Sequence, residues 1–199
     1  MTRTLAALCL LTISTAAQSA ITLSLDPANQ EALTGSSFDV RLIIAGLGGG
    51  GPPSLGTFDV DVSFDPSILS FNTATFGDPL LGDQLDLGGL GSVIEVTSKD
   101  GTINLFELSL DSAADLDTLQ TAGFVLATMN FKALTTGSTV LTPSVKALGD
   151  ALGDPLMADS IRPAVATVSP IPEQTPVALI AAGLLVVIGL AKVRHMTRK

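Results

Sequence analysis

The stretch GTFDVDVSFD, residues 56–65, decides the fold of this chain, because apolar and polar residues alternate along it without interruption. Successive side chains of a β-strand point to opposite faces of the sheet. Phe58, Val60 and Val62 therefore share one face, and the residues between them lie on the other. This pattern predicts an antiparallel strand with one face in the core and one face in water.

Short segments with the same alternation surround this strand, separated by loops rich in Gly and Asp. Charged residues make up only 15% of the chain, against a typical ~25%. About nine short strands with turns between them predict an all-β sandwich of two packed sheets, with a hairpin turn at residues 99–101 and a helical turn within residues 111–120. The other strands are predicted at residues 21–25, 37–45, 68–71, 92–98, 102–110, 124–134, 139–148 and 164–168.

The first twenty residues have the organisation of a secretory signal peptide. Arg3 supplies the positive start, residues 5–13 the apolar centre and residues 16–20 the small-residue cleavage region. The apolar run is short for an uncleaved membrane anchor, so we expect export and removal of this segment. Cys9, the only cysteine, lies inside it, and the mature protein would contain no disulfide.

The segment between the two ends is strongly acidic. Residues 21–176 contain 5 basic and 19 acidic residues. Such a surface repels nucleic acid and anionic lipid and favours solubility. We therefore expect no nucleic-acid partner.

Three motifs of this segment resemble those of cohesin domains. The run VDVSFDPSILSF, residues 60–71, looks like the third-strand signature of cohesins, in which an apolar strand ends in an aromatic-Asp-Pro turn. Residues 34–40 (TGSSFDV) are similar to the opening of their second strand, and residues 123–132 (GFVLATMNFK) resemble a late strand. The resemblance covers residues 21–168 and implies a cohesin-like jelly-roll sandwich of about nine strands that serves in recognition rather than catalysis.

The sequence offers little for catalysis. The one histidine, His195, lies beyond the C-terminal apolar run, which excludes a nucleophile activated by histidine and disfavours zinc or copper in the domain. Asp59 and Asp61 are close enough for a glycosidase pair, but their position on a solvated strand face predicts a role in solubility. We expect no enzymatic activity.

Calcium is the ion that the loops would suit best. Asp78, Asp83 and Asp86 in the loop 77–91 supply hard oxygen ligands on a Gly-rich backbone, and the loop 149–159 holds three more aspartates. Their spacing matches no calcium motif. We therefore expect no cofactor, with calcium at Asp78, Asp83 and Asp86 as the alternative.

Aromatic composition disfavours sugar binding. Glycan-binding surfaces usually stack rings of Trp or Tyr, and the chain contains neither. Its eight phenylalanines are predicted to lie in the core. They are Phe38, Phe58, Phe64, Phe71, Phe76, Phe106, Phe124 and Phe131.

The last thirty residues carry the strongest functional signal. Pro172, Glu173 and Gln174 precede an unbroken apolar run, residues 177–191, and a basic end follows. As a helix this run covers ~22 Å, against ~30 Å for the hydrocarbon core of a bilayer. The positive end predicts a cytoplasmic tail and an exported domain. The bases of the tail are Lys192, Arg194, Arg198 and Lys199.

The order of short motif, apolar helix and basic end resembles the PEP-CTERM sorting signal of Gram-negative bacteria. The chain departs from that signal where Gln174 stands in place of a second proline. The resemblance implies an exosortase-type processing enzyme as a partner, and export across the inner membrane. Transient anchoring with a cytoplasmic C-terminus would precede release to the cell surface or extracellular matrix. A plain single-span anchor is the alternative.

The sequence thus divides into a signal peptide (1–20), a cohesin-like sandwich (21–168), a linker with the sorting motif (169–176), and a transmembrane helix with a basic tail (177–199). The leading hypothesis is a non-catalytic structural or adhesive component of the envelope or exopolysaccharide matrix. One alternative is a cohesin-type receptor for a dockerin-like or other protein partner. The other is a carbohydrate-binding module.

Overall fold

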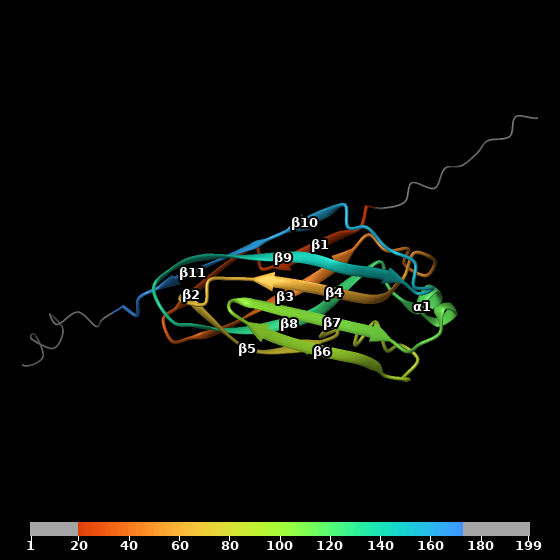
Figure 1. The fold of residues 1–199 in the computed structure, drawn as a ribbon, viewed down its shortest axis with the longest axis horizontal. Helices are drawn as coiled ribbons and strands as arrows, with labels where there is room; N and C mark the ends of the chain where they lie inside the picture. The colour runs from red at the N-terminus through yellow and green to blue at the C-terminus, as the bar shows by residue number, and fades with distance from the viewer. Residues whose placement is uncertain (1–19, 173–199) are drawn as a thin grey trace, which may run out of the picture.

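Two packed β-sheets form the structure, a computed structural model that describes residues 20–172 (Figure 1). Within these residues there are eleven strands and one short helix. In chain order the elements are β1 (Thr22–Asp26), β2 (Asn29–Leu33), β3 (Ser37–Ala45), β4 (Leu55–Ser63), β5 (Leu69–Phe76), β6 (Ser92–Lys99), β7 (Thr102–Ser109), α1 (Ala113–Leu119), β8 (Gly123–Ala133), β9 (Gly137–Asp150), β10 (Ser160–Arg162) and β11 (Ala164–Ser169).

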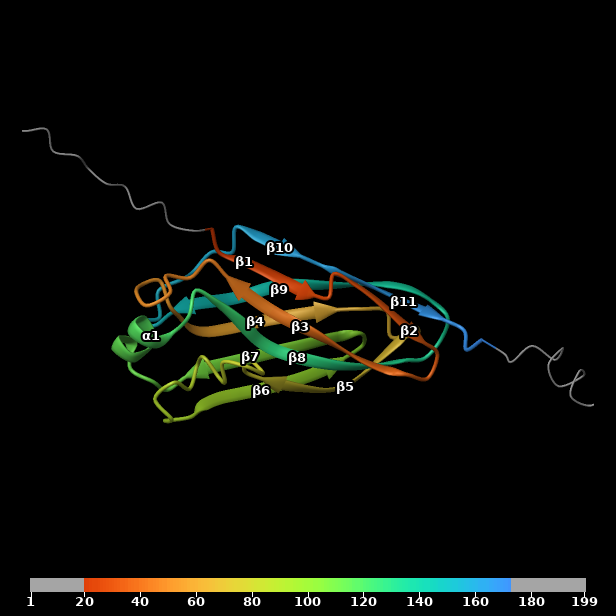
Figure 2. The same ribbon diagram turned by 180° about the vertical axis from the view of Figure 1, so that it is seen from behind.

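The strand order is β10-β1-β3-β8-β5 in the first sheet and β2-β11-β9-β4-β7-β6 in the second. Figures 1 and 2 show the two layers from opposite sides. Pairing is antiparallel except for β1 with β10 and β2 with β11. The predicted all-β sandwich is confirmed, with two strands more than the predicted nine.

The two additional strands, β2 and β10, arise where the chain crosses from one sheet to the other. β1 pairs with β3 in the first sheet, whereas β2, after Pro27 and Ala28, pairs with β11 in the second. Near the C-terminal end, Pro163 separates β10 from β11 in the same way. Proline has no backbone N–H and interrupts a ladder, so β2 and β10 form as separate short strands. Both lie outside the strands predicted at residues 21–25 and 164–168.

Strand β4 lies between β9 and β7 and has the predicted orientation. Phe58, Val60 and Val62 are all 0% exposed. The hairpin turn also forms as predicted, with Asp100 and Gly101 at φ of 50° and 78°. A Cβ on Gly101 would lie 2.6 Å from the Phe64 carbonyl oxygen, so only glycine fits this turn. The helical turn is α1, whose N-cap Ser112 accepts a hydrogen bond from the Asp115 N–H.

The core is aromatic at its centre. Phe131 is fully buried, and its ring centroid lies 5.9 Å from that of Phe38, 5.3 Å from Phe64 and 6.0 Å from Phe71. Seven of the eight phenylalanines belong to the core or pack against it. The exception is Phe106, whose neighbours Leu105 and Glu107 on β7 point inward. The prediction of a core position is therefore wrong for Phe106, which lies half-buried on the outer side of the sheet.

Some predictions fall outside the described residues. The signal peptide and the C-terminal helix with its basic tail lie in segments 1–19 and 173–199. Between residues 20 and 172, no helix has both the length and the apolar character needed to cross a membrane. All residues of the core cluster lie between Ile21 and Val168, so this part of the chain is expected to fold without the flanking segments.

The buried Phe131 and the half-buried Phe106 should contribute differently to the stability of the domain. Phe131→Ala should lower the free energy of unfolding by about 3–5 kcal/mol, because it removes a buried ring and leaves a cavity. Phe106→Ala, the matched control, should lower it by about 1 kcal/mol or less. Urea denaturation of residues 20–172, followed by circular dichroism, measures both. Equal losses in the two variants would contradict the assignment of Phe106 to the outer surface.

Candidate functional site

The solvent side of β9, β4, β7 and β6 carries a group of polar and apolar side chains, which we call the β4 face. Its residues come from four adjacent strands of one sheet, so a regular backbone holds them in place. They are Asp59, Asp61, Val93, Glu95, Asn104, Phe106, Leu108 and Lys146.

A network of polar side chains occupies the middle of the β4 face. The Asn104 side-chain amide donates hydrogen bonds to Asp59 Oδ1 at 2.5 Å and to Asp61 Oδ1 at 2.9 Å. The Lys146 amine lies 2.8 Å from Asp61 Oδ1. Partial burial works against the ionised form of Asp61, but the hydrogen bonds from Lys146 and Asn104 outweigh it and hold the pKa of Asp61 below its ordinary value. The carboxylate therefore stays charged and fixed in position at neutral pH.

An apolar strip lies next to this network. Phe106 is the residue opposite Asp59 in the β4–β7 ladder. Beside it on the same face, Leu108 is 39% exposed and its cross-strand partner Val93 is 48% exposed. A large ring with exposed aliphatic neighbours on a rigid sheet is a surface that gains free energy when a partner covers it.

The outer side of the other sheet is more polar. On β3 and β8, Arg41 forms an ion pair with Asp26, and Asn130 donates a hydrogen bond to Asp39 Oδ1 at 2.6 Å. Asn72 on β5 donates in turn to the Asn130 side-chain oxygen at 2.8 Å. The β4 face is thus distinguished by its aromatic and aliphatic strip, not by its hydrogen bonds.

The aspartates proposed for calcium fold their own loop. Asp78 accepts backbone hydrogen bonds from Leu80 and Leu81 through Oδ1 and from Val125 through Oδ2. Asp83 Oδ1 and Asp86 Oδ1 each accept one backbone N–H of the same loop, at 2.9 Å and 2.7 Å. Among residues 20–172, no three acidic, histidine or cysteine side chains come together as metal ligands. The structure gives these aspartates a structural role.

The aspartates of the second acidic loop, residues 149–159, also accept hydrogen bonds from backbone N–H groups. Asp150 Oδ1 accepts the backbone N–H groups of Leu152 and Asp154 at 2.9 Å and 2.8 Å. Asp159 Oδ2 accepts the N–H of Ile21 at 2.9 Å and so ties this loop to the start of β1.

Glu107 is a buried acid that the sequence analysis did not single out. Its side chain is 0% exposed, and Oε1 accepts a 2.6 Å hydrogen bond from the Ser92 hydroxyl. Burial raises the pKa of Glu107 to about 8, and the nearby carboxylates of Asp83 and Asp86 add to the rise against the opposing effect of Ser92. Glu107 is therefore neutral at pH 7. Its Oε2 is buried without a hydrogen-bond partner, and in the neutral acid this oxygen can carry the proton.

Alternation along β7 places Glu107 inward once the pairing with β4 shows which face of β7 is buried. Ile103 and Leu105 occupy the two preceding inward positions, and Glu107 takes the next one. An acid at an inward strand position signals a neutral or paired carboxyl group.

Glu107 makes the stability of the domain depend on pH. Its pKa is about 8 in the folded chain and about 4.3 in an unfolded one. The folded state therefore holds a proton that the unfolded state releases, and the free energy of unfolding should fall as pH rises from about 4.3 to about 8. Glu107→Gln, which resembles the neutral acid, should remove this dependence.

Melting temperatures of both proteins between pH 5 and pH 9 measure this effect. The exposed Glu95→Gln on the adjacent strand is the control and should keep the wild-type dependence. A Glu107→Gln variant that loses stability between pH 5 and pH 9 as steeply as the wild type would contradict the assignment of a neutral Glu107.

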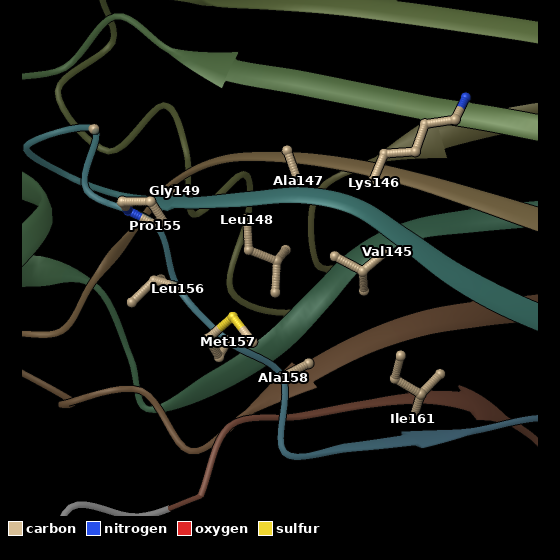
Figure 3. A pocket seen from close by; sticks show the side chains of 11 residues that line it. Val145, Lys146, Ala147, Leu148, Gly149, Pro155, Leu156, Met157, Ala158 and Ile161 are labelled. Carbon is tan, nitrogen blue, oxygen red and sulfur yellow. The ribbon is translucent and has the colours of Figure 1, made fainter.

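A pocket of about 580 Å³ opens at another edge of the sandwich (Figure 3). It lies between the end of β9 and the segment that leads into β10, and its lining includes Leu148, Leu156 and Met157. The one charged residue of the lining, Lys146, has its amine against Asp61 on the β4 face. The pocket therefore offers apolar contact and no arrangement of groups for catalysis.

The sorting motif is described only at its first residue. Pro172 follows β11 and is exposed. Glu173, Gln174 and the basic residues Lys192, Arg194, Arg198 and Lys199 lie outside the described residues, so the sorting signal remains a prediction.

No family model matches the chain. Among curated proteins, cellulose-binding protein A of Clostridium cellulovorans is 32% identical over 109 residues, which are 54% of this chain. The match spans only 5% of the length of that protein.

Several solved structures share the fold. The sixth cohesin of scaffoldin B from Acetivibrio cellulolyticus, in complex with a Cel5 dockerin mutant, has a TM-score of 0.57 at 18% identity; the match covers 76% of this chain and all of that one. The fold is therefore cohesin-like. A cohesin in the OlpA–Doc918 complex from Clostridium thermocellum has a TM-score of 0.58 at 14% identity, covering 75% and 99% of the two chains. A non-cellulosomal cohesin from Archaeoglobus fulgidus has a TM-score of 0.54 at 14% identity, covering 78% and 94%.

Proposed function

We propose that this chain carries an exported, non-catalytic protein-binding domain of the cohesin type, which binds a dockerin-like partner through the β4 face. The observation that carries the proposal is Phe106, a half-buried aromatic ring on the outer side of a cohesin-like sheet, beside the fixed carboxylates of Asp59 and Asp61. The leading hypothesis from the sequence, a structural or adhesive matrix component, becomes the second candidate.

The composition of the β4 face suits a protein partner. Residues that dominate binding energy are large side chains near the centre of an interface, surrounded by contacts that exclude water. Phe106 and Leu108 supply the apolar part of such a centre. The network of Asn104, Asp61 and Lys146 is already ordered, so the entropy cost of fixing these side chains is met before the partner arrives.

Charge indicates the chemistry of the partner. Residues 21–176 are strongly acidic, with 5 basic and 19 acidic residues. Two carboxylates lie at the middle of the β4 face, and only Lys146 opposes them there. A partner with basic side chains around an apolar patch would be attracted by this surface and held in register.

The similar structures support a protein partner rather than a sugar. The cohesins from Acetivibrio cellulolyticus and Clostridium thermocellum were solved in complexes with dockerins. A carbohydrate-binding role is less well supported, since the exposed aromatic residue of the β4 face is a phenylalanine without a polar edge.

Export and sorting complete the proposal. An exosortase-type enzyme would process the chain near Pro172, Glu173 and Gln174 after transient anchoring in the inner membrane, and the domain would reach the cell surface or matrix. In Figure 2 the described chain starts beside β1 and ends beyond β11, on the side away from α1. A tether at the C-terminal end therefore leaves the β4 face open.

Capture experiments with residues 20–172 test the binding role. The domain should retain a stoichiometric protein from the envelope extract of its own organism. Phe106→Ala and Asn104→Ala should each weaken binding by about 30-fold, since a central interface residue contributes ~2 kcal/mol or more.

Asn130→Ala is the matched control for Asn104→Ala, because both amides donate to an aspartate but lie on opposite outer faces. Binding that survives in the Asn104 and Phe106 variants would refute the β4 face as the site. Retention on exopolysaccharide without a protein partner would favour the matrix role.

The mass of the surface-released protein tests the sorting proposal. Processing at the motif should yield a product that lacks residues 177–199, and intact-mass spectrometry would show the difference directly. A released protein that retains the basic tail would exclude sorting by cleavage and favour a plain anchor.

A further inference from the structure

Strand β6 is an unprotected edge of the second sheet. The four edge strands of the described sandwich are β10, β5, β2 and β6. β10 has only three residues, β2 has five, and the pairing of β5 with β8 shifts in register between Phe71 and Thr73. β6 pairs with β7 over eight residues without a shift. Short or irregular edges resist pairing with another chain, and β6 has neither protection.

The backbone groups of β6 that face solvent can be identified. The Leu110 N–H donates to the Gly91 carbonyl, which makes this opposite pair a hydrogen-bonded one. Hydrogen-bonded and non-bonded pairs alternate along an antiparallel ladder. Val93, Glu95 and Thr97 therefore bond to β7, and the N–H and C=O groups of the residues between them point away from the sheet. Those residues are Ile94, Val96 and Ser98.

The side chains of β6 are also uncovered. Ile94 is 48% exposed and Val96 is 37% exposed, although both belong to the inner side of the sheet. β6 therefore projects beyond the cover that the first sheet provides. A long, regular edge with exposed β-branched residues is a template for a further strand.

We propose that β6 pairs with β6 of a second copy of this chain, antiparallel, around a two-fold axis at Val96. In this register Val96 lies opposite Val96 of the second copy, and Ile94 lies opposite Ser98. The three residues with free backbone groups all form hydrogen-bonded pairs, and the apolar side chains of both inner faces cover each other. The interface is self-complementary, as a closed dimer requires.

The charge of β6 favours its pairing with β6 of a second copy, because the rest of the domain surface is acidic and β6 is not. β6 contains one acid, Glu95, and one base, Lys99, so the strand itself is neutral. In the proposed register each Glu95 lies opposite Thr97 of the other copy, with Lys99 of that copy on one diagonal and its Glu95 on the other. Two otherwise acidic domains can therefore approach along this strand without like charges in direct opposition.

The dimer would join the two second sheets into one. Because paired residues belong to the same side of the sheet, the two β4 faces would look in the same direction and stay uncovered. Dimerisation thus does not require the proposed partner, and either can exist without the other.

Sedimentation equilibrium of residues 20–172 from micromolar to near-millimolar concentration tests the proposal. The weight-average mass should rise to twice that of the monomer and no further. Val96→Lys should remain monomeric at every concentration. Val140→Lys, at an exposed valine of β9 (51% exposed), is the matched control and should dimerise like the wild type. A monomeric wild type, open-ended association, or equal dimerisation of Val96→Lys would overturn the proposal.

Amide hydrogen exchange of the wild type gives a second test that needs no variant. The amides of Ile94, Val96 and Ser98 should exchange freely in dilute solution and become at least tenfold slower where the dimer forms. Those of Val93, Glu95 and Thr97 should be protected at all concentrations, because they bond to β7. A dimer in which Ile94, Val96 and Ser98 still exchange freely would refute pairing through β6.

Discussion

Burial of Phe58, Val60 and Val62 between the two sheets fixes the position of every outward residue on β4. A strand has a period of two, so a shift of one residue would expose these three side chains and bury the aspartates between them. The cost of that exchange determines the register with β7 and β9. Asn104 therefore lies opposite Asp61, and Phe106 opposite Asp59. The core thus positions the surface that we assign to binding.

Two prolines determine where the chain passes from one sheet to the other at one edge of the sandwich. Pro27 and Pro163 end the ladders of β1 and β10, and the chain continues in the other sheet as β2 and β11. The crossings link the two layers at the edge that contains β10 and β2. At the opposite edge the loop 77–91 connects β5 of the first sheet to β6 of the second. Leu85 of this loop is buried, whereas Ile94 and Val96 on β6 remain exposed.

The sequence predicts those parts of the fold in which local pattern and burial agree. Alternation predicts β4, the Asp-Gly pair predicts the β6–β7 hairpin, and both are confirmed. The core position predicted for Phe106 is wrong because β7 has apolar residues on both faces, with Leu105 inward and Phe106 outward. Only its pairing with β4 decides which face is buried, and pairing is a long-range property. The same ambiguity hid Glu107, which lies inward between two residues that point out.

Glu107 lies where the core, the loop 77–91 and strand β6 meet. Its hydrogen bond from Ser92 ties it to the first residue of β6, and the nearby carboxylate of Asp83 in the loop 77–91 helps to raise its pKa. The same loop is held by a 2.5 Å hydrogen bond from the Ser109 hydroxyl to the Leu85 carbonyl oxygen, at the end of β7. Leu85 is only 1% exposed, so the loop closes this end of the core. A neutral acid can serve here because it both donates and accepts, whereas a carboxylate would face Asp83 and Asp86 as a third negative charge. A protonated Glu107 therefore adds no third negative charge beside Asp83 and Asp86.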